Sequence, residues 1–172
     1  MTGPNNHTAA LAHYIIHAGP RHMGATRLNK VLWFADIIAY RRRGRSLTGA
    51  ESYRRMQHGP VPHGIDTVLN NLKVQGAVSE EGAPTLFGVR REFLSRRAPD
   101  VSCFSPEDIA LIHEVMTFVL THNAAEISEQ THDALWDEIE NGQDMSVAAA
   151  SVFPAEITEE DFDLLDKAPS HS

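Results

Sequence analysis

Apolar residues recur at helical spacing in several segments of this 172-residue chain. The most apolar segment runs from about residue 26 to residue 43 and is hydrophobic on nearly every side. One face holds Leu28, Val31, Leu32, Ala35, Ile38 and Ala39, and much of the other holds Trp33, Phe34, Ile37 and Tyr40. A helix of this kind belongs at the centre of a domain. We therefore expect this spine helix, capped by Thr26, to carry the core.

Other helices are predicted on both sides of the spine helix. Residues 8–18 precede a Gly19-Pro20 stop, and Thr48 to Glu51 has the form of a capping box that predicts a short helix carrying Tyr53 and Met56. A further helix has the stripe Ile65, Val68, Leu69 and Leu72 and ends at Gly76. Ser105 and Pro106 mark a strong helix start. Helices are also expected over residues 123–135, with Trp136 anchoring the end, and over residues 158–165, whereas residues 141–154 look irregular.

Two segments break the helical pattern. Gly59-Pro60-Val61-Pro62 predicts a stiff corner, because each proline fixes its backbone and removes a donor, and Pro62 also suits the first turn of the next helix. Residues 77–95 predict a β-hairpin around Glu80-Glu81-Gly82, with Phe87, Val89 and Phe93 on a half-buried face. The fold class expected is mainly α (α+β): a single globular helical domain with one small antiparallel hairpin, partly winged-helix-like. Residues 1–140 would form it, and residues 141–172 an acidic extension with a short helix, packed on the same domain.

Charge divides the chain into unequal parts. Residues 1–100 hold fourteen Lys/Arg and seven Asp/Glu, whereas residues 101–172 hold one and sixteen. This asymmetry suits a basic docking surface, an acidic mimic of one, attraction between the halves, or simply two solvated faces. Cys103 is the only cysteine and no apolar run reaches the roughly 20 residues that span a bilayer, so we expect a cytoplasmic protein without a membrane partner.

Candidate catalytic, metal and cofactor sites are weak. His13 and His17 share a helix face but lack the glutamate of a zinc-protease pattern, and Ser128 and His132, four apart on a predicted helix, favour a structural hydrogen bond. His58 and His63 flank the proline corner and read as hydrogen-bonding or surface groups. Because no phosphate loop or activated cysteine is evident either, we expect no catalytic residue, no metal, no cofactor and no enzyme activity.

Polar residues interrupt the spine helix at Asn29 and Asp36, which lie seven apart and hence on one side. Buried polar groups need partners. The structural interpretation is that both bind backbone groups of a neighbouring turn, such as the proline corner. The functional interpretation is a polar contact inside a partner-binding cleft. The sequence favours the structural one.

DNA binding is the alternative that residue patterns raise. A helix from residue 62 to residue 75 followed by a hairpin has the order of a winged-helix module, with Arg90 and Arg91 on the wing. Phosphate contacts need such cations. The presumed recognition helix, however, carries one lysine and no arginine, and the acidic second half would repel DNA. DNA is therefore the less favoured partner.

Four segments occur together in a recognisable order: LNKVLWFADIIAY, HGPVPHGIDTVLNNL, Gly76-Ala77-Val78 and ISEQTHDALW. This set resembles the Panacea domain family, also called the SocA-like antitoxin or phage-associated GepA-like domain, from about residue 8 to residue 136. The resemblance implies signature positions with a mainly structural role: Asn29, Lys30, Trp33, Phe34, Asp36, Gly59, Pro60, Val61, Ser128 and His132. Pro62 and the extension after Trp136 depart from the pattern.

The function that this resemblance implies is that of an antitoxin in a toxin–antitoxin system. It would neutralise a cognate toxin, encoded by a neighbouring gene, through direct protein–protein binding. The SocA type additionally implies an adaptor role, in which the toxin is delivered to an ATP-dependent protease. Residues outside the signature are expected to choose the partner, namely Arg90, Arg91, Phe162, Leu164 and Leu165. The alternative is a winged-helix-like DNA-binding transcriptional regulator.

Overall fold

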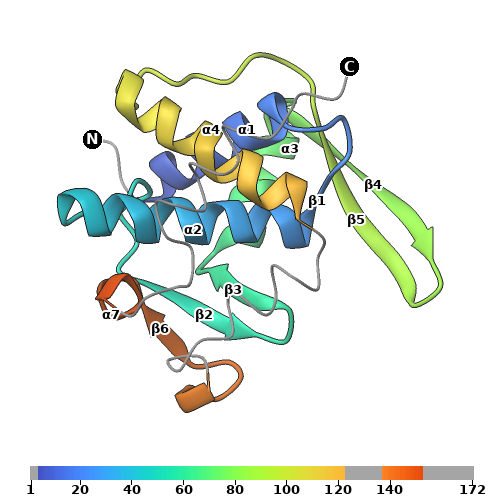
Figure 1. Cartoon of the computed structure of the whole chain (residues 1–172). Coiled ribbons are helices and arrows are strands. Elements are labelled where there is room, and N and C mark those ends of the chain that lie inside the picture. The colour runs from blue at the N-terminus through green and yellow to red at the C-terminus, as the bar shows by residue number, and fades with distance from the viewer. Residues whose placement is uncertain (1–3, 123–136, 153–172) are drawn as a thin grey trace.

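The computed structural model of the chain describes residues 4–122 and 137–152. Helix α2 crosses the middle of the molecule, and the other elements surround it (Figure 1). The elements in chain order are α1 (Pro4–Ala18), β1 (Met23–Gly24), α2 (Ala25–Arg43), β2 (Ser52–Met56), β3 (Gly59–Pro62), α3 (Ile65–Val74), β4 (Val78–Thr85), β5 (Gly88–Ser95), α4 (Pro106–Thr121), β6 (Asp144–Ser146) and α7 (Val147–Val152).

The expected fold class is wrong, because the molecule is a mixed α+β structure. The described residues contain two three-stranded antiparallel sheets, with strand orders β1-β5-β4 and β3-β2-β6. A mainly helical domain with one hairpin accounts for only one of these sheets. The hairpin of the partly winged-helix-like expectation is not a separate two-stranded element, because β1 pairs with β5 and makes it part of a three-stranded sheet.

The spine-helix prediction is confirmed. Eleven residues of α2 are buried, and Trp33 and Phe34 are 3% and 2% exposed. The edge of the Phe34 ring packs against Phe118 of α4. The predicted cap is wrong: the helix begins after Gly24, which provides no side-chain hydrogen bond, and not at Thr26. It ends at Gly44, whose positive φ of 72° lets its N–H reach the carbonyl of Tyr40.

Residues 52–62 form a hairpin where the sequence predicted a short helix and a corner. Strand β2 carries Tyr53 and Met56, and the Gly59–Pro62 segment is strand β3, with Tyr53 opposite Pro62 and Met56 opposite Gly59. Pro62 therefore lies in a strand, and α3 begins at Ile65. Because β3 is at the edge of its sheet, its two prolines remove no hydrogen bond that the sheet needs. Strand β3 nevertheless packs against α2, and both of its prolines are buried.

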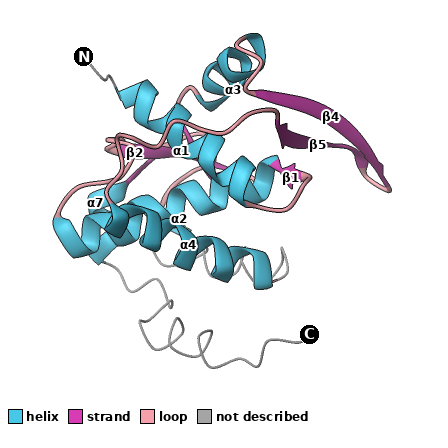
Figure 2. Cartoon of the chain, turned by 90° about the horizontal axis from the view of Figure 1, so that it is seen from above, coloured by secondary structure: helices cyan, strands magenta, loops and turns pink. Residues whose placement is uncertain are grey.

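The second hairpin is present as predicted, although its turn lies at Leu86-Phe87 and not at Glu80-Glu81-Gly82. Its base is buried through Val78 and Phe93, and its outer half projects beyond the helices in two perpendicular views (Figures 1 and 2). The start of α4 is also confirmed, with a capping box formed by Ser105 and Asp108. Arg43 at the end of α2 then bridges to Asp108 at 2.5 Å.

The segment expected to be irregular, residues 141–154, contains β6 and α7. Strand β6 pairs with β2, Met145 lying opposite Tyr53, and the Arg41 Nε of α2 donates to the Ser151 carbonyl of α7 at 3.0 Å. Residues 144–152 are thus joined to the spine helix and its neighbouring sheet. The helices predicted over residues 123–135 and 158–165, and the Trp136 anchor, lie outside the described residues. No helix in the described part of the chain is long and apolar enough to cross a membrane.

Candidate functional site

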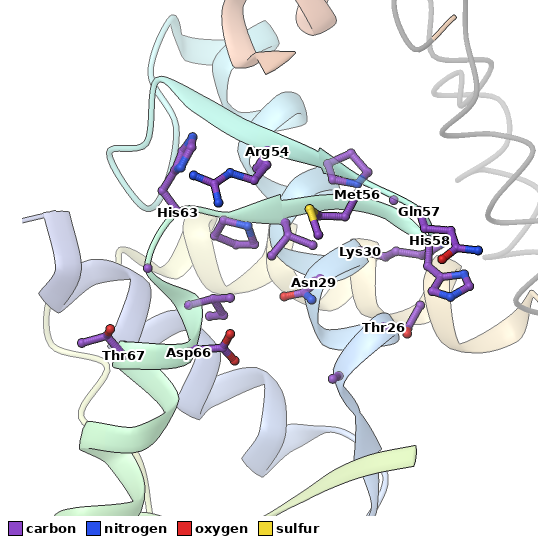
Figure 3. A pocket seen from close by; sticks show the side chains of 17 residues that line it. Thr26, Asn29, Lys30, Arg54, Met56, Gln57, His58, His63, Asp66 and Thr67 are labelled. Atoms are coloured by element: carbon purple, nitrogen blue, oxygen red, sulfur yellow. The ribbon is translucent and has the colours of Figure 1, made fainter. Parts of the chain in front are cut away.

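A pocket of about 470 Å³ opens where the start of α2, the strand β3 and the start of α3 meet (Figure 3). Three stretches of the chain contribute to its lining: some residues of 25–30, most residues of 54–62, and all residues of 63–67. Three glycine and proline positions of β3 form one wall, and the first turns of the two helices form the others. The lining residues are Ala25, Thr26, Asn29, Lys30, Arg54, Met56, Gln57, His58, Gly59, Pro60, Val61, Pro62, His63, Gly64, Ile65, Asp66 and Thr67.

The wall from α2 presents three polar side chains at helical spacing. Thr26, Asn29 and Lys30 are at i, i+3 and i+4, so one face of the first two turns points into the pocket. Lys30 is 1% exposed, and burial lowers the pKa of its ammonium group from 10.5 to about 8. The Oδ1 atom of Asn29 is buried and accepts no hydrogen bond from the described residues. The pocket thus contains an unused acceptor beside a partly desolvated cation.

At Gly59 the strand passes beside this lysine, and the backbone angle, not the space, calls for glycine there. Its φ of 136° suits glycine alone, and a Cβ atom there would lie 3.6 Å from Lys30 Cε. Lys30 of the spine helix and Gly59 of the predicted corner are therefore direct neighbours, although they lie in separate segments of the sequence. Gly59 and Pro60 are buried and Val61 is half-buried.

The charges at the pocket rim are unequal. Asp66 accepts from Arg91 at 2.9 Å, and His63 lies 2.9 Å from Asp144. Arg54 is exposed and makes no ion pair with any described residue. The lining carboxylate is therefore already balanced by an arginine outside the pocket. The other charged side chains in the lining, Lys30 and Arg54, are cations.

Asp36 lies two turns farther along α2 and is fully enclosed. Its carboxylate accepts from the Thr48 backbone N–H at 3.0 Å, from the Thr48 hydroxyl at 2.5 Å and from the Tyr53 hydroxyl at 2.7 Å. Burial raises the pKa of Asp36, while these donors act in the opposite direction. The structural interpretation therefore holds for Asp36, but its partners are the loop at residue 48 and strand β2, not the proline segment.

The remaining signature positions divide between the core and the undescribed part. The Trp33 ring meets Tyr53 edge-on at 4.9 Å, so it joins α2 to β2. Ser128 and His132 lie outside the described residues. The signature role that the resemblance implies for these positions stays a prediction.

The predicted partner-binding arginines are engaged within the chain. Arg91 donates to Glu80 at 2.5 Å as well as to Asp66, and it lies over the Phe93 ring at 5.5 Å. Arg90 pairs with Glu92. Arg91 and Lys73 hold the pKa of Glu80 at about 2 against a desolvation effect in the other direction. The other candidates, Phe162, Leu164 and Leu165, lie outside the described residues.

The hairpin tip is apolar and exposed, which the sequence analysis did not predict. Leu86 and Phe87 in the turn are 98% and 99% exposed, and Val89 is 73% exposed. The expectation that Phe87 and Val89 share a half-buried face with Phe93 is wrong, because the hairpin outgrows the core and only its base is covered. The length of the two strands was the signal that could have predicted this. Each strand has eight residues, but buried apolar residues occur only near one end of each.

The histidine and cysteine candidates from the sequence have surroundings that do not indicate catalysis or metal binding. His13 Nε2 lies 3.0 Å from the Arg97 carbonyl, and His17 Nδ1 lies 2.9 Å from Ser95 Oγ. Cys103 is exposed, but partial desolvation of its thiol raises the pKa and so disfavours the thiolate. Across residues 4–122 and 137–152, no group of three His, Cys, Asp or Glu side chains is placed to hold a metal ion.

The comparisons with known proteins give one match. The family model of the antitoxin SocA-like, Panacea domain matches residues 28–137, well over half of the chain. This range holds most of the pocket lining and all of the second hairpin. Comparison with curated proteins and with solved structures gives no match. The chain belongs to the antitoxin SocA-like, Panacea domain family.

Proposed function

We propose that this protein is an antitoxin that neutralises a toxin protein by binding it directly, with the tip of the β4–β5 hairpin at the centre of the contact. Family membership supports the antitoxin role. The observation that carries the binding mode is the nearly complete exposure of Leu86 and Phe87. The mechanism is stoichiometric burial of a toxin surface, and no chemical step is involved.

The hairpin tip has the composition of an interface anchor. Two large apolar side chains at the end of a projecting element remain in water in the isolated chain, and Val89 extends the patch along β5. Burial of apolar area contributes roughly 25 cal/mol per Å². Contiguous exposed apolar patches mark interaction sites in soluble proteins. Because stable complexes bury about 1,200–2,000 Å², the tip would form the centre of a larger contact.

The base of the hairpin suits this role because it is held rigidly. Arg91, Glu80 and Asp66 tie β5 to β4 and to the start of α3. Gly24 and Met23 of β1 pair with Glu92 and Phe93 on the other side of β5. A tip presented on a braced base loses little conformational entropy on binding, which increases affinity.

The test replaces Leu86 and Phe87 together by aspartate and measures binding of the toxin encoded beside this gene by calorimetry. We expect affinity to fall by about 100-fold, which corresponds to about 2.7 kcal/mol and is typical of a hot spot. The folded state should be unaffected, because both side chains are already in water. In a growth assay with the toxin, the double variant should fail to protect.

A matched control is Val74→Asp, which changes another apolar side chain that is 88% exposed but lies on α3. This variant should bind the toxin as the original protein does. Unchanged affinity of the Leu86/Phe87 variant would overturn the hairpin contact. An equal loss with Val74→Asp would show that the contact is not centred on the tip.

Two further roles have less support. Delivery of the toxin to an ATP-dependent protease would shorten the half-life of the toxin in a reconstituted degradation reaction, and this adaptor role stays a prediction. DNA binding through a wing is disfavoured by the pairing of Arg90 and Arg91 with carboxylates. A duplex titration at several salt concentrations tests it, because phosphate contacts weaken steeply as salt rises.

A further inference from the structure

Strand β5 has a backbone edge that the described part of the chain leaves open over its outer half. The strand spans Gly88–Ser95, but β1 pairs with only Glu92 and Phe93 on the side away from β4. The chain then leaves β1, because helix α2 begins at Ala25. No described strand therefore lies beside residues 88–91 on that side, and all four residues are exposed. Figures 1 and 2 show β1 beside the base of β5 only.

The pairing register shows which backbone groups point to this open edge. In an antiparallel pair, alternate residues exchange hydrogen bonds with the partner strand, and the residues between them point away. The Arg96 N–H donates to the Ala77 carbonyl at 2.8 Å, in line with the β4–β5 register. The even-numbered residues of β5 therefore bond to β4. The N–H and C=O groups of Val89 and Arg91 point to the open edge.

The opposite edge of the same hairpin is closed to strand addition near its tip. By the same alternation, Glu80, Gly82 and Pro84 of β4 point outward. Proline has no N–H to donate, and prolines and charged side chains are the residues that protect an edge strand from pairing. Val89, which lies opposite Pro84, keeps its N–H. A strand can therefore be added more readily at the β5 edge than at the β4 edge.

We propose that an extended segment of the toxin binds along residues 88–91 of β5 as an antiparallel strand in line with β1. This inference rests on the proposed function and states the form in which the hairpin recognises the toxin. Backbone donors and acceptors that recur every second residue match the backbone of another strand. Val89 is 73% exposed, so an apolar or β-branched side chain of the added segment packs beside it.

The strand also enlarges the contact that the tip begins. Leu86 and Phe87 are only two side chains, whereas stable complexes bury about 1,200–2,000 Å². A segment that runs from the tip along the β5 edge joins these side chains to the backbone groups of Val89 and Arg91. The tip and the edge then form one continuous surface.

Charge disfavours a second copy of this chain as the occupant of the edge. An antiparallel pair of β5 strands that uses Val89 and Arg91 of both copies places Arg90 opposite Arg90 of the second copy. Like charges directly opposite each other are destabilising. The side chain of Arg90 is 62% exposed even though it pairs with Glu92, so it faces this neighbour. A toxin segment with a neutral or acidic residue at that position avoids the repulsion.

The experiment follows amide hydrogen exchange by NMR in the full chain, alone and with the toxin encoded beside this gene. We expect the Val89 and Arg91 amides to exchange about tenfold more slowly, or slower still, in the complex, because they gain hydrogen bonds. The Gly82 amide is the matched internal control, since it points outward on the opposite edge and should be unchanged. The Arg90 and Glu92 amides, which bond to β4, report that the hairpin is intact.

Two variants at one position separate the backbone bond from the side-chain contact. Val89→Pro removes the outward N–H, and Val89→Ala shortens the side chain but keeps the N–H. By calorimetry, Val89→Pro should bind the toxin about two- to tenfold more weakly than Val89→Ala, which corresponds to the loss of one hydrogen bond. Protected Arg90 and Glu92 amides in Val89→Pro confirm that its hairpin still pairs.

Each outcome distinguishes this inference from the proposed function. Slower exchange at Val89 and Arg91, but not at Gly82, supports the added strand. Toxin binding with unchanged exchange at Val89 and Arg91 overturns the added strand and leaves the antitoxin role in place. An absence of toxin binding overturns both. Slower exchange that appears as the concentration of this protein alone is raised shows that a second copy occupies the edge, which overturns the assignment to the toxin.

Discussion

Two polar side chains on α2, Asp36 and Asn29, lie two helical turns apart and have opposite surroundings. Asp36 accepts three hydrogen bonds from the loop and strand that follow α2, and it is 0% exposed. Asn29 lies in a pocket wall, and its side-chain oxygen accepts no hydrogen bond from the described residues. The sequence alone does not distinguish the two residues, because both are polar residues on the same side of an apolar helix. The difference shows that only one of them is part of the internal framework.

This difference distinguishes a polar group that holds the fold together from a polar group that lines a pocket, within one helix. A polar group that holds a fold together has all its partners within the chain. The Asp36 cluster meets this condition, and it fixes Tyr53 and therefore the β2–β3 hairpin relative to the spine. Asn29, at the pocket end, does not meet it, because its side-chain oxygen lacks a donor among the described residues. Three substitutions or titrations test the comparison, beginning with the largest expected effect.

Removal of the Asp36 carboxylate should have the largest effect. Asp36→Ala leaves the Thr48 and Tyr53 donors buried without an acceptor, so we expect the free energy of unfolding to fall by about 3–5 kcal/mol. Thermal unfolding and denaturant titration measure the loss. The control is Glu81→Ala, which changes an exposed acid on β4 and should leave stability nearly unchanged. A loss for Asp36→Ala as small as that of the control would contradict the framework role.

Titration of Lys30 should have an intermediate effect. Burial lowers the pKa of this lysine from 10.5 to about 8, so between these pH values the unfolded chain holds a proton that the folded chain has released. Stability should therefore rise with pH across this window by about 1–3 kcal/mol relative to Lys30→Met. Below pH 8 the penalty is constant, because both states are protonated.

Denaturant unfolding of the original protein and Lys30→Met at several pH values measures the difference curve, in which other titrating groups cancel. A difference curve that stays flat from pH 8 to pH 10 would show that Lys30 is not desolvated.

Removal of the Asn29 amide should have the smallest effect on stability. Its oxygen has no partner to lose among the described residues, so Asn29→Ala should change the free energy of unfolding by no more than about 0.5 kcal/mol. Thermal unfolding of this variant beside Asp36→Ala gives the contrast directly. A large loss would mean that Asn29 belongs to the framework like Asp36, and the comparison between the two ends of the helix would fail.

The sequence predicted those elements whose signals are local. The burial of α2 follows from its composition, the start of α4 from Ser105 and Pro106, and the β4–β5 hairpin from its change in periodicity. The capping-box prediction at Thr48 failed for a physical reason. Thr48 Oγ1 does accept from a backbone N–H nearby, that of Ala50 at 3.1 Å, but its own hydroxyl proton goes to Asp36. The local signal was real, and a distant acceptor decided its outcome.

Strand β3 and the pocket could not be predicted from the sequence for a related reason. Pro60 and Pro62 are typical of a corner when seen alone, and they become an edge strand only because β2 pairs with them and β6, about ninety residues later, pairs with β2. The sequence identified Asn29 as needing a partner but could not show that it lacks one. The cavity depends on the distance between three separate segments, which no local pattern encodes.

The sequence by itself determined which helix is the spine, where α4 begins and that a second hairpin follows α3. It also determined that the family signature is present. These features could be predicted because composition, capping and periodicity act within a few residues. The tertiary structure alone decided that Gly59 meets Lys30, that Asp36 is satisfied while Asn29 is not, and that Leu86 and Phe87 stand in water. These outcomes depend on long-range pairing, since a side chain's burial and hydrogen bonds are set by whichever distant segment packs against it.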